Sequence, residues 1–105
     1  MSLYTAITLR DLSKVRSIIG DPEFEMEPYP LERAIEMGDI YIINELLNSE
    51  KIYFDPFWVE YYAAFTFSDA IYDLVTKHER FIERVNRLPT LSRWWYKLGF
   101  YRLCR

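Results

Sequence analysis

The chain has 105 residues and a net charge of −3, and 50% of its residues are hydrophobic, including 18% that are aromatic. This length suits one domain with a modest core, and the apolar content argues against a disordered chain. The lone Cys104 excludes a disulfide within the chain and a cysteine-rich zinc site, and no apolar run reaches the roughly 18 residues of a membrane helix.

The N-terminal residues are predicted to form a pair of short antiparallel helices, over residues 2–9 and 12–19. Apolar residues recur there at the three- and four-residue spacing of one helical face. Asp11 is expected to cap the second helix, because its carboxylate can accept from the free N–H groups of a first turn. Gly20 is expected to end that helix.

The prolines of residues 21–30 prevent the helix from continuing. Acidic and apolar residues alternate in this segment. If it is extended, the acids face one way, and Phe24 and Met26 face the other. The segment is interpreted either as a solvated loop that these two residues pin to the core or as a loop that contacts a partner.

A second helical pair is predicted between Pro30 and Leu47. Pro30 suits a first helical turn, where its missing N–H costs nothing. Gly38 can take the left-handed conformation that ends helices, and Asp39 is placed to cap the next helix. The second helix is expected to place Ile40, Ile43, Leu46 and Leu47 on one face.

The two predicted pairs repeat each other at a separation of 28 residues. A fixed period of this size is typical of stacked helical repeats. The matched positions are Leu3, Ala6, Ile7, Asp11, Leu12, Val15, Ile18 and Ile19 against Leu31, Ala34, Ile35, Asp39, Ile40, Ile43, Leu46 and Leu47.

The run Pro30-Leu31-x-x-Ala34, followed by Gly38-Asp39 and the paired leucines, resembles the ankyrin repeat. The chain departs from that family's signature at Tyr29, where Thr is preferred, at Glu32, where His is preferred, and in its shorter period. The resemblance covers residues 2–48 and, more loosely, 57–77. It implies an all-α fold of two to three stacked helix-turn-helix pairs whose connecting loops contact a partner.

The rest of the chain is predicted to complete the stack. Residues 49–56 form either a short strand or an extended connector, and Ser68-Asp69 offers a cap within a degenerate third pair over 57–87. The apolar spacing from Ile71 to Val85 predicts one longer helix reaching about Arg87. Pro89 breaks the chain, and a basic, aromatic helix over 90–105 is expected to cover the open end of the stack. Residues 1–105 are thus predicted to form a single domain, with ankyrin-like pairs in 1–48.

Charge divides unevenly along the chain. Residues 84–105 carry a charge of +6 without any acidic residue, and residues 1–83 carry −9. The basic segment could grip phosphates and stack bases, lie on an anionic membrane surface, or pair with the acidic part of the same or a second copy. The candidate nucleic-acid-binding residues are Arg84, Arg87, Arg93, Trp95, Lys97, Arg102 and Arg105.

No catalytic or metal-binding motif is found. His78 is the only histidine, its predicted place is mid-helix, and no nucleophile motif lies near it. One histidine and one distant cysteine do not make a normal metal-ligand set, and three scattered glycines form no phosphate loop. We expect a protein that is not an enzyme and that uses no cofactor or metal.

The leading hypothesis is a cytoplasmic protein-protein interaction module, since the N-terminal residues lack the pattern of a signal peptide. A few repeats without chemistry suit a small inhibitor or adaptor, and by analogy alone a viral or phage protein acting on a host protein. Nucleic-acid binding through the basic segment is the alternative, and self-association through opposite charges is a further hypothesis. The candidate partner-binding residues are Asp21, Glu23, Phe24, Glu25, Glu27, Tyr29, Lys51, Tyr53 and Asp55.

Overall fold

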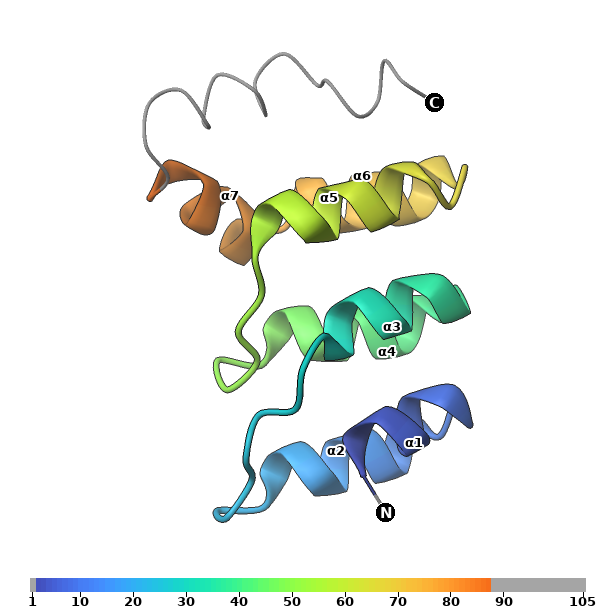
Figure 1. The fold of residues 1–105 in the computed structure, drawn as a ribbon, viewed down its shortest axis with the longest axis vertical. Coiled ribbons are helices and arrows are strands. Elements are labelled where there is room, and N and C mark those ends of the chain that lie inside the picture. The colour runs from blue at the N-terminus through green and yellow to red at the C-terminus, as the bar shows by residue number, and fades with distance from the viewer. Residues whose placement is uncertain (1, 88–105) are drawn as a thin grey trace. The chain divides into compact units, whose positions relative to one another are not determined.

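The computed structural model describes residues 2–87. These residues form helices α1 to α7 and contain no strand, which confirms the predicted all-α fold (Figure 1). The chain divides into two compact units: unit 1, Met1–Phe54, holds α1 to α4, and unit 2, Asp55–Arg105, holds α5 to α7. Each unit buries its own set of apolar side chains.

The first helical pair of unit 1 consists of α1 (Leu3–Thr8) and α2 (Leu12–Gly20), which pack against each other. Ser2 caps α1 by accepting a hydrogen bond from the Thr5 N–H at 3.1 Å. Asp11 caps α2 by accepting from the Lys14 N–H at 3.1 Å, as the sequence predicts. Both caps satisfy backbone donors that a short helix otherwise leaves without a partner.

The second pair consists of α3 (Pro30–Met37) and α4 (Ile40–Asn48). Gly38 ends α3 at a φ of 70°, a left-handed conformation that a residue without a Cβ adopts at little cost. One carboxylate oxygen of Asp39 then accepts from the first-turn N–H groups of Tyr41 and Ile42, at 3.0 and 3.2 Å. The predicted break and cap are therefore confirmed.

The core of unit 1 lies between the two pairs, because α1 packs on α3 and α2 packs on α4. Figure 1 shows the pairs lying side by side. One core prediction is wrong: Ile40 is 45% exposed, and Ile42 is fully buried. Ile40 is the first residue of α4, directly after the Asp39 cap, and Ile42 takes the core position instead. The hydrophobic side chains of this core are Leu3, Ala6, Ile7, Val15, Ile19, Leu31, Ala34, Ile35, Ile42, Ile43, Leu46, Leu47, Ile52 and Phe54.

The connector after α4 makes a turn at residues 50–51 and continues over 52–55 as neither helix nor strand. Its side chains alternate, since Ile52 and Phe54 are buried while Tyr53 is 67% exposed. This alternation is the two-residue period of an extended backbone. It anchors the connector to unit 1 and leaves Tyr53 on the surface.

Unit 2 begins with α5 (Pro56–Ala64) and α6 (Asp69–Thr76), which pack against each other, and continues with α7 (Glu79–Asn86), which contacts both. Ser68 caps α6 by accepting from the Ile71 N–H at 3.3 Å, as predicted. The predicted closing helix over 90–105 lies outside the described residues.

The longer helix expected from Ile71 to about Arg87 is wrong, because α6 ends at Thr76 and α7 starts at Glu79. His78 is therefore not mid-helix. Its backbone is extended, at φ −69° and ψ 139°, and its Nδ1 accepts from the Arg80 N–H at 3.1 Å. A histidine that caps a helix in this way redirects the chain, while the apolar spacing on either side continues.

Candidate functional site

The predicted partner-binding loops lie at the same end of the helices of unit 1, after α2 and after α4. Lys51 links them, because its Nζ donates to the carbonyl oxygens of Ile19 at 2.8 Å and Asp21 at 3.3 Å. This ammonium supplies donors to a helix C-terminus, where backbone carbonyls lack helical partners. Lys51 therefore has a structural role in addition to any contact with a partner.

Glu27 also stabilises the fold of unit 1. Its two carboxylate oxygens accept from the N–H groups of Leu3 at 2.7 Å and Tyr4 at 3.2 Å, at the start of α1. A carboxylate placed there satisfies free donors and complements the positive end of the helix dipole. Glu27 is half-buried in this position. Because Glu27 lies 24 residues from Leu3 in the sequence, this capping role could not be predicted from the sequence.

The remaining candidates are divided between the two units. Asp55 belongs to unit 2, where it caps α5 by accepting from the Phe57 N–H at 2.9 Å. Phe24 is half-buried, as expected of a residue that pins the loop, but Met26 is 39% exposed. Tyr29 and Tyr53 are each 67% exposed. The candidates that stay at the surface of unit 1 are Asp21, Glu23, Glu25, Tyr29, Lys51 and Tyr53.

A row of exposed aromatic side chains follows α5 and the turn after it in unit 2, and sequence reasoning did not single it out. We define this aromatic row as Phe57, Trp58, Tyr61, Phe65 and Phe67, which are between 38% and 68% exposed. Tyr61 and Phe65 lie 4.9 Å apart between ring centroids, and Trp58 meets Tyr61 edge-on at 5.8 Å. The four-residue spacing of Phe57, Tyr61 and Phe65 was the signal for one helical face.

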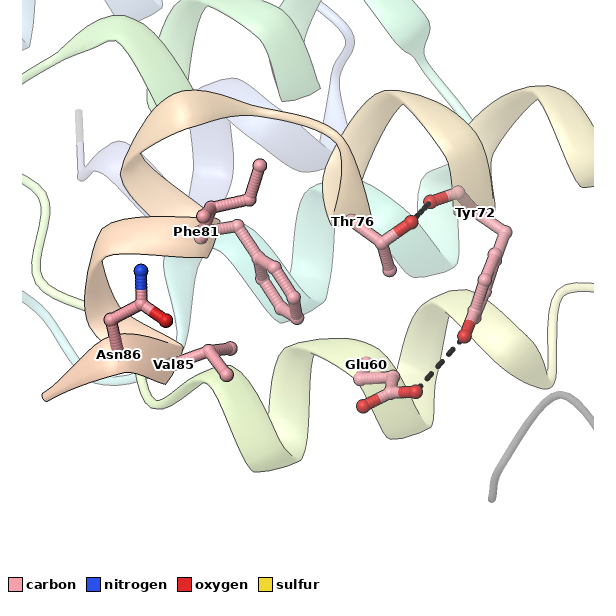
Figure 2. A pocket seen from close by; sticks show the side chains of 7 residues that line it. Glu60, Tyr72, Thr76, Phe81, Val85 and Asn86 are labelled. Atoms are coloured by element: carbon pink, nitrogen blue, oxygen red, sulfur yellow. Dashed lines mark hydrogen bonds between the residues drawn. The ribbon is translucent and has the colours of Figure 1, made fainter. Parts of the chain in front are cut away.

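Unit 2 also contains a cavity of about 240 Å³ between α5, α6 and α7. Figure 2 shows the carboxyl group of Glu60 and the rings of Phe81 and Tyr72 around this space. Phe81, Ile82 and Val85 give it one apolar side. The described lining residues are Glu60, Tyr72, Thr76, Phe81, Ile82, Val85 and Asn86.

Glu60 is the charged group of this cavity, and it is only 2% exposed. Its Oε1 accepts from the Tyr72 hydroxyl at 2.9 Å, whereas its Oε2 is buried without a hydrogen-bond partner among the described residues. Burial raises the pKa of the Glu60 carboxyl to about 7, and the hydrogen bond from Tyr72 opposes part of that rise. At neutral pH the group is therefore divided between its acid and carboxylate forms.

Among the described lining residues, Glu60 is the one carboxyl group, and Tyr72 is the other titratable side chain. The Thr76 hydroxyl donates to the Tyr72 carbonyl at 2.7 Å, and the apolar side supplies no second acid, base or nucleophile. A carboxyl group with a raised pKa in a cleft is nevertheless a candidate functional group. Its geometry suits the binding of a hydrogen-bond donor or a cation.

No family model, curated protein or solved structure matches this chain. Its function is therefore inferred from the aromatic row and the cavity.

His78 and the acidic residues make no metal site in the described part of the chain. No cluster of three or more His, Cys, Asp or Glu within residues 2–87 could hold an ion. Burial lowers the pKa of the His78 imidazole, the nearby Arg80 lowers it further, and Glu79 opposes the shift. The neutral ring that results is the form whose Nδ1 can accept the capping hydrogen bond.

The candidate nucleic-acid-binding residues fall mostly outside the described chain. Of the seven, residues 2–87 include Arg84, which is half-buried, and Arg87, which is exposed and pairs with Glu83 on the same helix. Arg93, Trp95, Lys97, Arg102 and Arg105 lie beyond it. Among α1 to α7, no helix has the length and apolar character needed to cross a membrane.

Proposed function

We propose that this protein is a non-catalytic protein-protein interaction module, and that the aromatic row is its principal contact surface. The row carries the proposal. Tyrosine and tryptophan side chains dominate the binding energy of protein interfaces, because they bury a large area at a small cost in conformational entropy. Trp58 is 47% exposed and Tyr61 is 38% exposed, so both can lose further area to a partner.

Other residues of α5 are buried in unit 2. The same helix buries another face, made of small or medium-sized residues that include Val59, Ala63 and Ala64. An exposed apolar patch of this kind on a folded domain typically marks an interaction site. The edge-on ring contacts along the row also limit side-chain motion before binding, which lowers the entropy that a complex must overcome.

Unit 1 supports the same class of function by a different surface. Its loops expose Tyr29 and Tyr53, and the loop after α2 also exposes the acidic Glu23 and Glu25. The resemblance of its helical pairs to ankyrin repeats makes these loops a second contact surface in the proposal. Two surfaces on one small chain suit an adaptor, and occlusion of a partner's site by either one suits an inhibitor.

The test is affinity capture from the source cells with the tagged chain, its Trp58→Ala/Tyr61→Ala variant and a Tyr41→Ala control. Tyr41 is 77% exposed on α4 in unit 1, so it controls for the loss of an exposed tyrosine. We expect the wild type and the control to recover a stoichiometric protein, and the double variant to lose it. Circular dichroism establishes that the double variant keeps its helices.

Nuclease treatment separates this proposal from nucleic-acid binding. Recovery through a protein interface survives nuclease and changes little with salt, whereas recovery through phosphate contacts collapses with nuclease and weakens steeply as salt rises. If capture depends on nucleic acid, or if the double variant recovers the same protein at the same level, the aromatic row is not the contact surface.

A further inference from the structure

We propose that the cavity of unit 2 binds a primary ammonium group carried on a compact apolar body, with the carboxylate of Glu60 as its counter-ion. This inference concerns a small-molecule site between α5, α6 and α7. It does not depend on the contact surface proposed above.

The first support is the hydrogen bonding of Glu60. One oxygen is occupied by the Tyr72 hydroxyl, and Oε2 has no hydrogen-bond partner in the part of the chain that the structure describes. A buried polar atom without a partner destabilises the fold, because it has lost its hydration without replacement, so native structures usually satisfy such atoms. A ligand N–H would supply the missing donor.

The second support is the charge around the cavity. Among residues 2–87, no lysine, arginine or histidine lines it, and Tyr72 is the other titratable lining residue. An ionised carboxylate in such a place is stable only if it is paired. An ammonium group would supply both the charge and the donors.

The third support is the shape and polarity of the space. Phe81, Ile82 and Val85 form an apolar side, and Thr76 and Asn86 add polar atoms. The cavity volume of about 240 Å³ exceeds that of an engineered cavity of about 150 Å³ that binds benzene. A single aromatic ring with a short aminoalkyl chain fits this combination.

Access to Oε2 requires a small movement, because that atom is sealed from solvent. The terminal torsion of a glutamate side chain is broad and roughly two-fold. A partial rotation about this torsion, combined with a small change in the other Glu60 side-chain torsions, turns Oε2 toward the cavity while the Tyr72 hydroxyl continues to donate to Oε1.

The experiment is a titration of the full chain with phenethylamine, followed by the backbone amide signals in heteronuclear NMR spectra. Phenethyl alcohol, which replaces the ammonium with a hydroxyl, is the matched ligand control. We expect saturable shifts confined to α5, α6 and α7 with the amine, and weaker binding of the alcohol by about tenfold or more, since it lacks the charge. Equal binding of the two ligands, or shifts spread over unit 1, overturns the proposal.

Two variants of the cavity test whether the amine binds there. Glu60→Gln keeps the size of the side chain and removes its charge, and we expect it to weaken binding by about tenfold or more. Glu32→Gln makes the same change at the buried glutamate of α3 in unit 1, and binding should be unchanged. Val85→Phe fills the cavity and leaves Glu60 in place, so it should abolish binding while the amide signals of a folded protein persist. Retained binding in either cavity variant contradicts the assignment.

The pH dependence and a lysine analogue distinguish the remaining ligand chemistries. An ion pair needs the carboxylate, so the affinity should rise from about pH 6 to pH 8 as Glu60 ionises around its pKa of about 7. A ligand that accepted a hydrogen bond from the protonated acid would show the opposite trend. Tighter binding of N-acetyl-lysine methylamide than of phenethylamine would indicate that the cavity binds the lysine of a partner. It would overturn the proposal that the ammonium group is carried on a compact apolar body.

Discussion

Replacement of Glu60 by glutamine should make unit 2 more stable at alkaline pH and have little effect on its stability at acidic pH. The amide oxygen of the new side chain can still accept from the Tyr72 hydroxyl, which lies 2.9 Å from Oε1 in the wild type. The amide NH2 replaces one carboxyl oxygen, and both side chains are uncharged at low pH, so their effects on stability should differ little there. At high pH the wild type must hold a buried charge, and the variant holds none.

The sign and size of the effect follow from the raised pKa. Between its ordinary value of 4.5 and about 7, Glu60 binds a proton in the folded state and not in the unfolded state. Its contribution to stability is therefore present below that range and is lost as the pH rises through it. Since a tenfold change in an acid dissociation constant corresponds to about 1.4 kcal/mol, the variant should be more stable than the wild type by about 3 kcal/mol at pH 8. Because Glu60 is 2% exposed, solvent screening reduces this figure little.

The assay is urea unfolding of both proteins at several pH values from about pH 4.5 to pH 8. Tryptophan fluorescence reports on unit 2, since Trp58, Trp94 and Trp95 all fall within Asp55–Arg105. The difference in the free energy of unfolding between variant and wild type cancels the contributions of the other titrating groups, which both proteins share. The exposed Glu79→Gln in α7 serves as the control and should change with pH far less. A difference that is constant over this range, or that favours the wild type as the pH rises, would refute the reasoning.

Two further predictions concern helix caps in unit 1. Asp39→Ala removes the acceptor of two first-turn N–H groups of α4 and should lower the free energy of unfolding by about 1 kcal/mol, measured by urea unfolding; no loss would show that solvent satisfies these donors equally well. Glu27→Ala should cost a similar amount and should speed hydrogen exchange in the first turn of α1, because its carboxylate accepts from two N–H groups there. The neighbouring Glu25→Ala, which changes an exposed residue of the same loop, should leave that exchange unchanged.

Sequence reasoning succeeds here where structure depends on neighbouring residues. Asp11, Asp39 and Ser68 cap their helices by accepting from N–H groups only two or three residues away. Gly38 ends α3 because its own backbone conformation is left-handed. Such interactions are visible in the order of residues, so the helical pairs and most of their buried faces could be predicted.

The features that were missed depend on residues that meet only in the folded chain. Glu27 caps a helix that begins 24 residues before it. The cavity needs Glu60 of α5, Tyr72 of α6 and Phe81 of α7 to converge, and a glutamate beside two tyrosines in sequence gives no sign of this. The break at His78 was hidden for a different reason, since apolar residues keep their helical spacing on both sides of it.

The composition of α5 is opposite to what stability alone would select. This helix buries Glu60 and two alanines, whereas Trp58 and Tyr61 remain 47% and 38% exposed. An aromatic side chain can bury about 150–250 Å², worth roughly 4–6 kcal/mol at about 25 cal/mol per Å². A helix selected only to fold would turn these rings inward and the carboxylate outward. Residues that are unfavourable for folding are expected at functional sites. Both kinds in α5 belong to a proposed site: the exposed rings belong to the aromatic row, and the buried Glu60 belongs to the cavity.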